Sequence, residues 1–248
     1  MREERSKPLL ALGFHAIEAA IASGKQIDKV MLTRGLQGEL YQKTITLIKE
    51  NQVPIQFVPI EKLNRISNKN HQGIIAFISP ITFGNLEELV SSTYEKGEVP
   101  LFLLLDGVTD VRNLGAIART AECMGAHGII VPESGSAPVN EDAVKTSAGA
   151  LMHIPICKTR LGIDAVQLLQ SMGIMCIAAS EKAEITPPSI DLTKPLCIIM
   201  GGEEKGISNA ILRSADYLIR IPMIGITTSL NVSVAAGMLL FETARQRS

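Results

Sequence analysis

Residues 101–106 read LFLLLD, an uninterrupted apolar run that ends in an acidic residue and is followed by Gly107. Four similar runs recur later in the chain: GIIVP at 128–132, IMCIAAS at 174–180, PLCIIMG at 195–201 and YLIRIP at 217–222. Helical patterns separate them at 113–125, 163–173 and 231–246. Fully apolar strands that alternate with helices are typical of a parallel sheet covered on both faces. Residues 99–248 are therefore predicted to form an α/β domain.

The sequence before this domain differs in charge and pattern. Residues 1–80 carry a net charge of +4. They alternate helical segments (13–24 and 38–51) with short strand-like segments (29–33, 55–60 and 73–79). We predict that these residues form a small α/β domain. Its basic side chains form either an RNA-facing patch or solvated helix faces. The basic residues are Lys25, Lys29, Arg34, Lys43 and Lys49. Residues 81–98 carry a net charge of −3, and we predict a linker with about one helical turn.

The overall composition excludes several protein classes. Of the 248 residues, 46% are hydrophobic and 20% charged, and the net charge is −1, so disorder and a global basic field are both excluded. The four cysteines are isolated, which is typical of reduced core thiols in a cytoplasmic protein and predicts no metal site. No apolar stretch approaches 18 residues, so neither a membrane span nor a signal segment is expected.

The first of three segments with candidate functional residues is LDGVTDVRNLGAIART, residues 105–120. A buried strand ends at Asp106, a polar loop follows, and a helix is expected to begin near Asn113. The guanidinium of Arg119 is suited to binding a phosphate or a ribose oxygen. The alternative is that Asn113 only caps the helix and that Arg119 is a solvated helix residue.

The other two segments follow later apolar runs, at the strand ends where open parallel sheets bind ligands. MGGEEKGIS, residues 200–208, places Glu203 in a glycine-rich turn, which lacks the spacing of a phosphate-binding P-loop. IPMIGITTSLNVSVAAG, residues 221–237, leads through a hydroxyl-rich loop into a helix expected near Asn231. Each segment also has a purely structural interpretation, as an ordinary turn or as a helix cap provided by Ser229 or Asn231.

Taken together, the three segments resemble the SpoU (TrmH) family of RNA 2′-O-ribose methyltransferases, within the SPOUT superfamily. The motifs NLGAIART (113–120), IIMGGEEKGIS (198–208) and IPMIGITTSLNVSVAAGMLLFE (221–242) stand in the family's order and spacing. The segments GFHAIEAAI (13–21) and NHQGIIAFIS (70–79) resemble the N-terminal substrate-binding domain of the RlmB-like branch. The resemblance covers nearly the whole chain.

The resemblance implies that residues 99–248 form a parallel sheet with a deep trefoil knot, a rare feature among protein folds. It implies S-adenosylmethionine (AdoMet) as cofactor, contacted by Gly201, Ile221 and Leu230 beside a homodimer interface. The polar active-site positions of the family fall on Asn113, Arg119, Glu203, Ser229 and Asn231.

The implied reaction is methylation of a ribose 2′-hydroxyl in structured RNA, most simply a guanosine of bacterial large-subunit (23S) ribosomal RNA. The family's arginine, here Arg119, has been assigned as the group that accepts the hydroxyl proton. Because a guanidinium has a pKa above about 12, we favour a role in which Arg119 orients the hydroxyl and an RNA phosphate. Glu203 and Asn231 would then fix the arginine and the ribose.

Three other functions are open to consideration. Transfer RNA is an alternative substrate. An RNA-binding assembly factor with a silent methylase site is a second possibility, although all the polar family positions are intact. A Rossmann-type nucleotide enzyme is disfavoured, because no G-x-G-x-x-G follows the first strand of either part of the chain.

Overall fold

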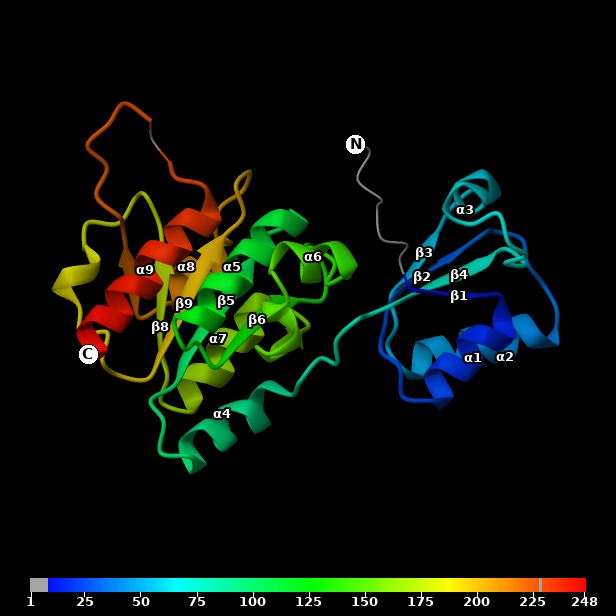
Figure 1. The fold of residues 1–248 in the computed structure, drawn as a ribbon, viewed down its shortest axis with the longest axis horizontal. Coiled ribbons are helices and arrows are strands. Elements are labelled where there is room, and N and C mark those ends of the chain that lie inside the picture. The colour runs from blue at the N-terminus through cyan, green and yellow to red at the C-terminus, as the bar shows by residue number, and fades with distance from the viewer. Residues whose placement is uncertain (1–8, 228) are drawn as a thin grey trace. The chain divides into compact units, whose positions relative to one another are not determined.

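The structure is a computed structural model that describes residues 9–227 and 229–248. The charged residues 1–8 (MREERSKP), which contribute to the net charge of residues 1–80, lie outside the described residues. Backbone contacts divide the chain into a small unit, Met1–Thr82 with Val139–Glu141, and a large unit, Phe83–Pro138 with Asp142–Ser248 (Figure 1). Each unit has its own sheet and its own hydrophobic core.

The small unit contains a four-stranded sheet in the order β1-β4-β2-β3. β4 runs antiparallel to β1 and β2, whereas β2 and β3 are parallel. Helices α1 and α2 bury apolar side chains such as Ile17 and Ile48 against one face of the sheet. The elements of this unit are β1 (Leu10–Leu12), α1 (Phe14–Ala22), β2 (Ile27–Leu32), α2 (Glu39–Glu50), β3 (Ile55–Phe57), α3 (Ile60–Ile66) and β4 (Ile74–Ile78).

Two of these elements were not predicted. The segment 55–60 was expected to be a single strand, but β3 ends at Phe57 and α3 begins at Ile60. Pro59 takes the N-cap position of α3, since its ring fixes φ near the helical value and removes a ladder donor. The side chain of Leu63 then packs on the sheet face opposite α1 and α2. β1 is only three residues long, which is too short for an alternation of apolar and polar side chains to predict a strand.

The large unit is built on a six-stranded, entirely parallel sheet in the order β10-β8-β9-β5-β6-β7. This confirms the parallel sheet predicted from the apolar runs. Its elements are α4 (Leu86–Glu95), β5 (Leu101–Asp106), α5 (Val111–Cys123), β6 (Gly128–Pro132), α6 (Glu141–Thr146), η1 (Ala150–Met152), β7 (Ile156–Thr159), α7 (Gly162–Ser171), β8 (Met175–Ala179), η2 (Pro187–Ser189), β9 (Leu196–Gly201), α8 (Asn209–Ser214), β10 (Tyr217–Ile219) and α9 (Val232–Arg247).

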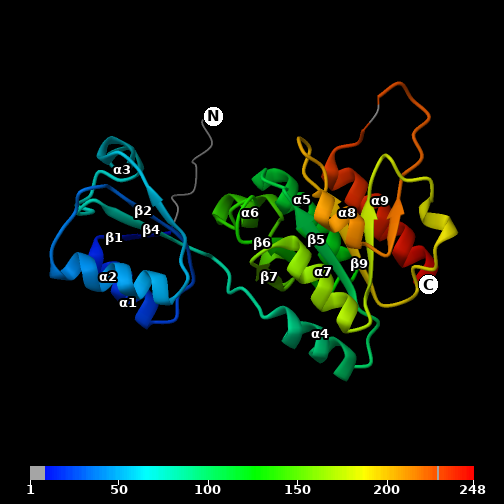
Figure 2. The ribbon, with the colours of Figure 1, turned by 180° about the vertical axis from the view of Figure 1, so that it is seen from behind.

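Helices cover both faces of this sheet. α5 and α9 pack against each other on one face, in front of the strands in Figure 1, and α7 and α8 pack on the other, which faces the viewer in Figure 2. Successive side chains of a strand point to opposite faces, so every residue of β5 from Leu101 to Leu105 is buried. Double coverage explains why these strands are apolar throughout rather than alternating.

Residues 86–95, which were expected to lie in a linker, form the three-turn helix α4 of the large unit. Its N-cap is Asn85, whose side chain accepts a hydrogen bond from the backbone N–H of Glu88. Leu86 and Val90 are spaced for one helix face and are buried in the core that α7 and α8 cover. The acidic residues lie on the exposed remainder of the helix, so the negative charge that suggested a linker belongs to a packed amphipathic helix.

Three of the four cysteines are buried in the large unit, as expected of core thiols, whereas Cys123 is exposed at the end of α5. Cys176 and Cys197 are register partners on the neighbouring strands β8 and β9. Burial raises the pKa of the Cys157 thiol to about 11. The Cys157 thiol is therefore protonated at neutral pH and poorly nucleophilic.

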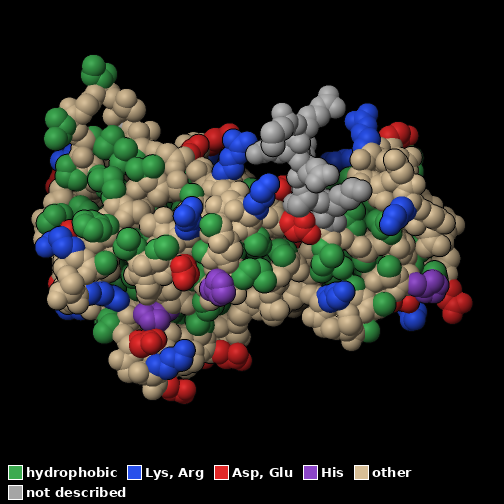
Figure 3. All heavy atoms as spheres, viewed as in Figure 1, with side chains coloured by type: hydrophobic (Ala, Val, Ile, Leu, Met, Phe, Trp, Pro, Cys, Tyr) green, Lys and Arg blue, Asp and Glu red, His purple; other side chains and the backbone are tan. Residues whose placement is uncertain are grey.

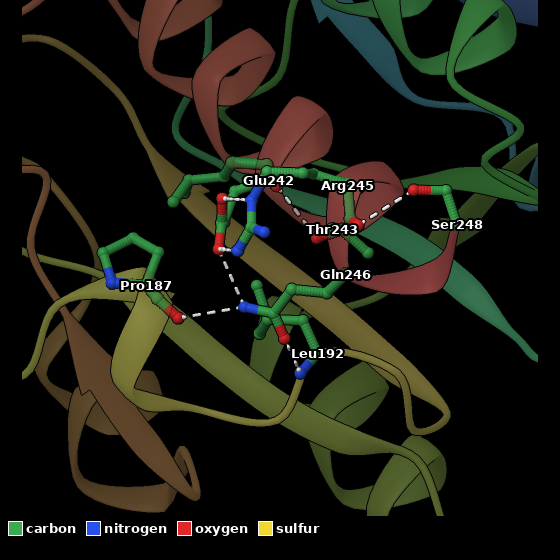
Figure 4. Close-up of polar contacts among 8 residues, drawn as sticks. Pro187, Leu192, Glu242, Thr243, Arg245, Gln246 and Ser248 are labelled. Atoms are coloured by element: carbon green, nitrogen blue, oxygen red, sulfur yellow. Dashed lines mark hydrogen bonds and ion pairs between the residues drawn. The ribbon is translucent and has the colours of Figure 1, made fainter.

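Polar contacts join the end of α9 to Pro187 and Leu192 in the segment before β9 (Figure 4). Gln246 accepts a hydrogen bond from the backbone N–H of Leu192 at 2.9 Å and donates to Glu242 at 2.8 Å. The half-buried guanidinium of Arg247 donates to four backbone carbonyls, those of Val99, Pro100, Leu192 and Lys194, at 2.8–3.1 Å. A single side chain thus ties the last helical turn to the start of β5 and to the loop before β9.

Removing the hydrogen bonds of Arg247, which clamp the end of α9, should lower the free energy of unfolding. Arg247→Met keeps much of the apolar stem but leaves four carbonyls without their charged donor, so we expect a loss of about 1–3 kcal/mol in the free energy of unfolding. Urea denaturation followed by far-UV circular dichroism measures the change. Arg245→Met is the matched control, because within the described residues the exposed guanidinium of Arg245 donates to the Glu242 carboxylate alone, at 2.8 Å. A control variant destabilised as much as Arg247→Met would contradict the clamp.

Candidate active site

Three polar side chains from distant parts of the sequence meet at the carboxyl end of the large sheet. Asn113 lies in the first turn of α5, Glu203 follows β9, and Asn231 precedes α9. The amide nitrogen of Asn113 donates to Glu203 Oε1 at 3.1 Å. Asn231 Nδ2 donates to the same oxygen at 2.7 Å and to Asn113 Oδ1 at 2.9 Å. We call these three residues the polar cluster.

The cap of α5 explains why Asn113 is free to join this cluster. Asp110, not Asn113, is the N-cap, and its carboxylate accepts hydrogen bonds from the backbone N–H groups of Arg112 at 2.6 Å and Asn113 at 3.4 Å. The interpretation of Asn113 as a simple cap is therefore wrong. Its side chain points away from the helix end toward Glu203 and Asn231.

Asn231 combines both interpretations that the sequence offered. Its Oδ1 caps α9 by accepting a hydrogen bond from the backbone N–H of Ser233 at 2.9 Å, and also one from the Ser233 hydroxyl at 2.5 Å. Its Nδ2 faces the other way, toward the polar cluster. The cap fixes which end of the amide is the donor, so the helix start orients the group that holds Glu203.

The polar cluster presents negative charge at an exposed position. Both amide groups donate to one carboxylate oxygen of Glu203, and the residue is exposed. Charge-assisted hydrogen bonds of this kind fix the orientation of a carboxylate without neutralising it. The arrangement is suited to contacting a cation or a hydroxyl group brought by a ligand.

The glycine-rich turn that carries Glu203 is folded tightly against the strand beside it. A Cβ atom on Gly202 would lie 2.0 Å from the carbonyl oxygen of Gly107, and one on Gly201 would lie 2.4 Å from backbone atoms of Gly206 and Ile207. Neither position tolerates any other residue without movement of the backbone. The glycines are thus required by the close approach of the chain to itself.

Asp106 holds both ends of this turn and was not selected from the sequence as a site residue. Its backbone carbonyl accepts a hydrogen bond from Gly202 N at 2.9 Å, and its carboxylate accepts one from Ser208 N at 2.7 Å. The available signal was its place at the end of the apolar run 101–106, where a charged side chain interrupts the pattern. That signal does not reveal a partner 102 residues away.

The remaining predicted residues are placed less closely together. Arg119 is exposed on α5, about 9 Å along the helix axis from Asn113, and the hydrogen bonds of the polar cluster do not include it. Gly201 is the last residue of β9, and Ile221 follows β10 by two residues. Ser229 and Leu230 are exposed in the loop before α9. The structure therefore brings together three of the five polar positions.

Within residues 9–227 and 229–248, no group of three His, Cys, Asp or Glu side chains is arranged to hold a metal ion. In the same described segments, no helix is long and apolar enough to cross a membrane.

Comparison with known proteins assigns this geometry to a family. Residues 100–241 match the family described as SpoU rRNA Methylase, and residues 10–83 match the domain described as RNA 2′-O ribose methyltransferase substrate binding. The chain belongs to the SpoU methylase family. Together the two matches cover most of both structural units.

Similar proteins support this assignment over the full length. A putative TrmH family tRNA/rRNA methyltransferase of Bacillus subtilis, YacO, is 33% identical over 96% of this chain and 95% of its own. The SpoU methyltransferase AviRb of Streptomyces viridochromogenes, solved with AdoMet, is 25% identical with a TM-score of 0.61, over 100% of this chain and 94% of that one. An AdoMet-bound rRNA methyltransferase of Sinorhizobium meliloti shares the fold at 24% identity and a TM-score of 0.62, over 97% and 88% of the two chains.

This SpoU protein is accordingly an RNA methyltransferase, and its methyl donor is AdoMet. The polar cluster lies in the three segments that carried the resemblance.

The hold that Asp106 exerts on the glycine-rich turn is testable. Asp106→Ala removes the acceptor for Ser208 N, and loss of a hydrogen bond to a charged group should speed amide exchange at Ser208 by about tenfold or more. Hydrogen–deuterium exchange measured by mass spectrometry or NMR would report it. Asp191→Ala, which removes an exposed carboxylate that accepts from Thr193 N at 3.0 Å, is the control. Unchanged protection of residues 202–208 in Asp106→Ala would show that the carboxylate does not hold the turn.

Proposed function

We propose that this SpoU protein methylates a ribose 2′-hydroxyl in structured RNA, specifically a guanosine of bacterial large-subunit ribosomal RNA. The observation that carries the proposal is the convergence of Asn113, Glu203 and Asn231 within 3.1 Å hydrogen bonds at the carboxyl end of the parallel sheet. A match at residues 10–83 to a substrate-binding domain of 2′-O ribose methyltransferases supports ribose as the target. It also supports the RlmB-like branch, and ribosomal RNA places the reaction in the cytoplasm.

The residues around the polar cluster suit AdoMet. Ile221 and Leu230 offer apolar side chains for an adenine ring, and Gly201 ends β9 beside the turn that carries Glu203. The exposed carboxylate of Glu203 is complementary to a positively charged sulfonium. AdoMet supplies an electrophilic methyl group, and its sulfur keeps the electron pair of the broken S–C bond.

The protein's part in the reaction is to position the ribose. In-line displacement requires the attacking oxygen to be aligned with the methyl group, and holding that alignment supplies much of the rate acceleration. Arg119 orients the 2′-hydroxyl and an adjacent phosphate through its planar guanidinium. Asn231 and Glu203 hold the ribose, and Ser229 offers a hydroxyl from the exposed loop before α9. The hydroxyl proton leaves to solvent or an RNA phosphate oxygen as the new C–O bond forms, because a guanidinium has donors only and no site that accepts a proton.

Transfer RNA is the alternative substrate, and the name of the B. subtilis relative covers both RNA classes. The second alternative is an RNA-binding assembly factor that no longer catalyses methylation. The intact polar cluster favours catalysis over this alternative, since an unused carboxylate would not require two amide donors and a helix cap to orient it.

We also propose that the protein is a homodimer and that its large unit contains the trefoil knot of SPOUT enzymes. α9 exposes Val234, Met238 and Phe241 at helical spacing, with 47–61% of each side chain accessible. Ile224 and Ile226 are fully exposed in the preceding loop, and Figure 3 shows hydrophobic side chains gathered over this part of the unit. Apolar surface on this scale is typical of a protein interface. A monomeric mass in sedimentation equilibrium at micromolar concentration would contradict the dimer.

The proposed reaction predicts one specific product. Purified protein, AdoMet and ribosomal RNA from cells lacking the protein should give methylation at a single ribose, detected as resistance of the 3′-adjacent linkage to alkaline hydrolysis. Transfer RNA from the same cells serves as the competing substrate. Methylation of a base, or of transfer RNA alone, would overturn the corresponding part of the proposal.

Arg119→Lys tests how the ribose is positioned. The variant keeps a positive charge but loses the planar fork, so we expect kcat to fall by about 100-fold or more while AdoMet affinity measured by calorimetry stays within about twofold. Turnover close to that of the wild type would be incompatible with an orienting guanidinium. Loss of AdoMet binding would instead assign Arg119 to the cofactor site.

A further inference from the structure

One edge of the small sheet collects side chains that the proposed reaction does not use. β2 and β3 are parallel and both end at this edge, with Leu32 paired to Phe57. β4 is antiparallel to β2 and begins there, with Ile74 paired to Leu32. The backbone N–H of Thr33 donates to the carbonyl of Gly73 at 2.9 Å, which joins the loop after β2 to the loop before β4.

The loop before β4, residues 67–73, is fixed by a buried histidine. His71 is 6% exposed, and its Nδ1 accepts a hydrogen bond from the backbone N–H of Gly73 at 3.1 Å. The proton of the neutral ring therefore lies on Nε2, which donates to Asn64 Oδ1 of α3 at 2.9 Å. Both ring nitrogens are committed to the protein. His71 is a support for the loop and not itself a ligand-binding group.

The residue that this support holds in place is Gln72. Its φ of +53° is a left-handed conformation that non-glycine residues rarely adopt, and its side chain is exposed. The side-chain oxygen lies over Gly13, 2.8 Å from where a Cβ would stand. A backbone kept in an unfavourable conformation to present an exposed amide indicates a use for that amide.

An aromatic ring and a guanidinium lie at the same edge. Phe57 is 51% exposed at the end of β3, and the guanidinium carbon of Arg34 is 5.9 Å from the centre of its ring. Lys69 is exposed in the loop that carries Gln72. We call Arg34, Phe57, Lys69 and Gln72 the loop edge.

The loop edge differs from the basic patch considered from the sequence. Of the five basic residues named there, Arg34 lies at this edge. Lys25 precedes β2 and Lys49 lies in the last turn of α2, both at the opposite end of the sheet. Lys43 pairs with Glu18 at 3.4 Å, and Lys29 stands over the ring of Phe77 at 5.1 Å. The five side chains therefore do not form one patch.

We propose that the loop edge binds unpaired nucleotides of the RNA substrate, a role that rests on the proposed function and adds its recognition site. Phe57 stacks on a base, with Arg34 extending the stacking surface and reaching a phosphate. Lys69 contacts a neighbouring phosphate as a mobile point charge. The amide of Gln72 reads the edge of a base, since it offers both donors and an acceptor.

The chemistry of the loop edge favours RNA over a protein partner. An exposed ring flanked by a cation is matched by a ligand that is both planar and anionic, and nucleotides are both. Lys62 and Arg65, exposed on the adjacent α3, add positive charge against the single carboxylate of Glu61. An unpaired loop is required, because stacking on Phe57 needs a base that is free of its own helix.

The test compares binding of two RNA probes to the full-length protein by fluorescence anisotropy. One is a hairpin with a ten-nucleotide loop of mixed sequence, and the other is a duplex of equal length. Phe57→Leu keeps an apolar side chain but removes the ring, and it should weaken hairpin binding by about 5- to 100-fold. Arg34→Ala combined with Lys69→Ala should lower the salt dependence of the log association constant by about 1.4, the value for two phosphate contacts on a single strand.

The controls are Lys25→Ala and Lys49→Ala, which remove equal charge from the opposite end of the same sheet and should change the hairpin affinity by less than twofold. AdoMet binding should be unchanged in every variant, since all these residues lie in the small unit. Equal losses in the control and loop-edge variants, no loss in the loop-edge variants, or equal wild-type affinity for hairpin and duplex would each overturn the assignment.

Gln72→Gly separates recognition from a purely structural role. Glycine adopts the +53° φ without strain, so thermal stability should be kept or raised while hairpin affinity falls by about fivefold or more. Unchanged affinity would show that the strained glutamine does not contact RNA. Ribose methylation by the wild type together with intact RNA binding by all loop-edge variants would leave the proposed function standing and reject the loop edge. Base methylation by the wild type together with impaired RNA binding by the loop-edge variants would reject the proposed function and leave the loop edge standing.

Discussion

The approach of the Gly202 backbone to the carbonyl of Gly107 is the constraint on which the active site depends. Without side chains at 201 and 202, the end of β9 turns against the end of β5, where Asp106 holds the turn at both ends. That turn carries Glu203 to within hydrogen-bonding distance of Asn113 and Asn231. The carboxylate of Glu203 thus gains a defined orientation through backbone packing and the amide donors of Asn113 and Asn231. The start of α9 fixes the amide of Asn231.

The two units carry different kinds of residues. The large unit supplies a sheet whose strand ends lie beside the residues proposed for methyl transfer. The small unit offers the loop edge, with an aromatic ring, cations and a glutamine whose backbone has a positive φ. Ribose chemistry by itself cannot choose one nucleotide among thousands, because the 2′-hydroxyl is the same in all of them. Selectivity therefore has to come from contacts made elsewhere on the RNA.

Much of the large unit could be predicted from the sequence, and the reasons are physical. A strand buried on both faces must be apolar throughout, so the run at 101–106 is informative by itself. The segments that hold Asn113, Glu203 and Asn231 were detectable because polar side chains interrupt such runs at strand ends, and the resemblance to the SpoU family then singled out these three residues. The role of Asp106 was not detectable, because its partner Ser208 is distant in sequence. α4 was obscured by its acidic exposed face, and β1 and α3 by their shortness. The contacts of Arg119 with a ligand do not follow from either the sequence or the fold.

Inclusion of α4 in the large unit has a consequence for how such proteins can be assembled. Leu86 and Val90 are buried in the core of the large unit, beneath α7 and α8. The linker between the two cores is therefore a few residues around Thr82 and not the expected 18 residues. A junction this short lies directly before the capped start of α4, so a cut near Thr82 leaves that helix, with Leu86 and Val90 of the large core, intact. Recombination at this junction offers a simple route by which one methyltransferase unit acquires N-terminal units for different RNA targets.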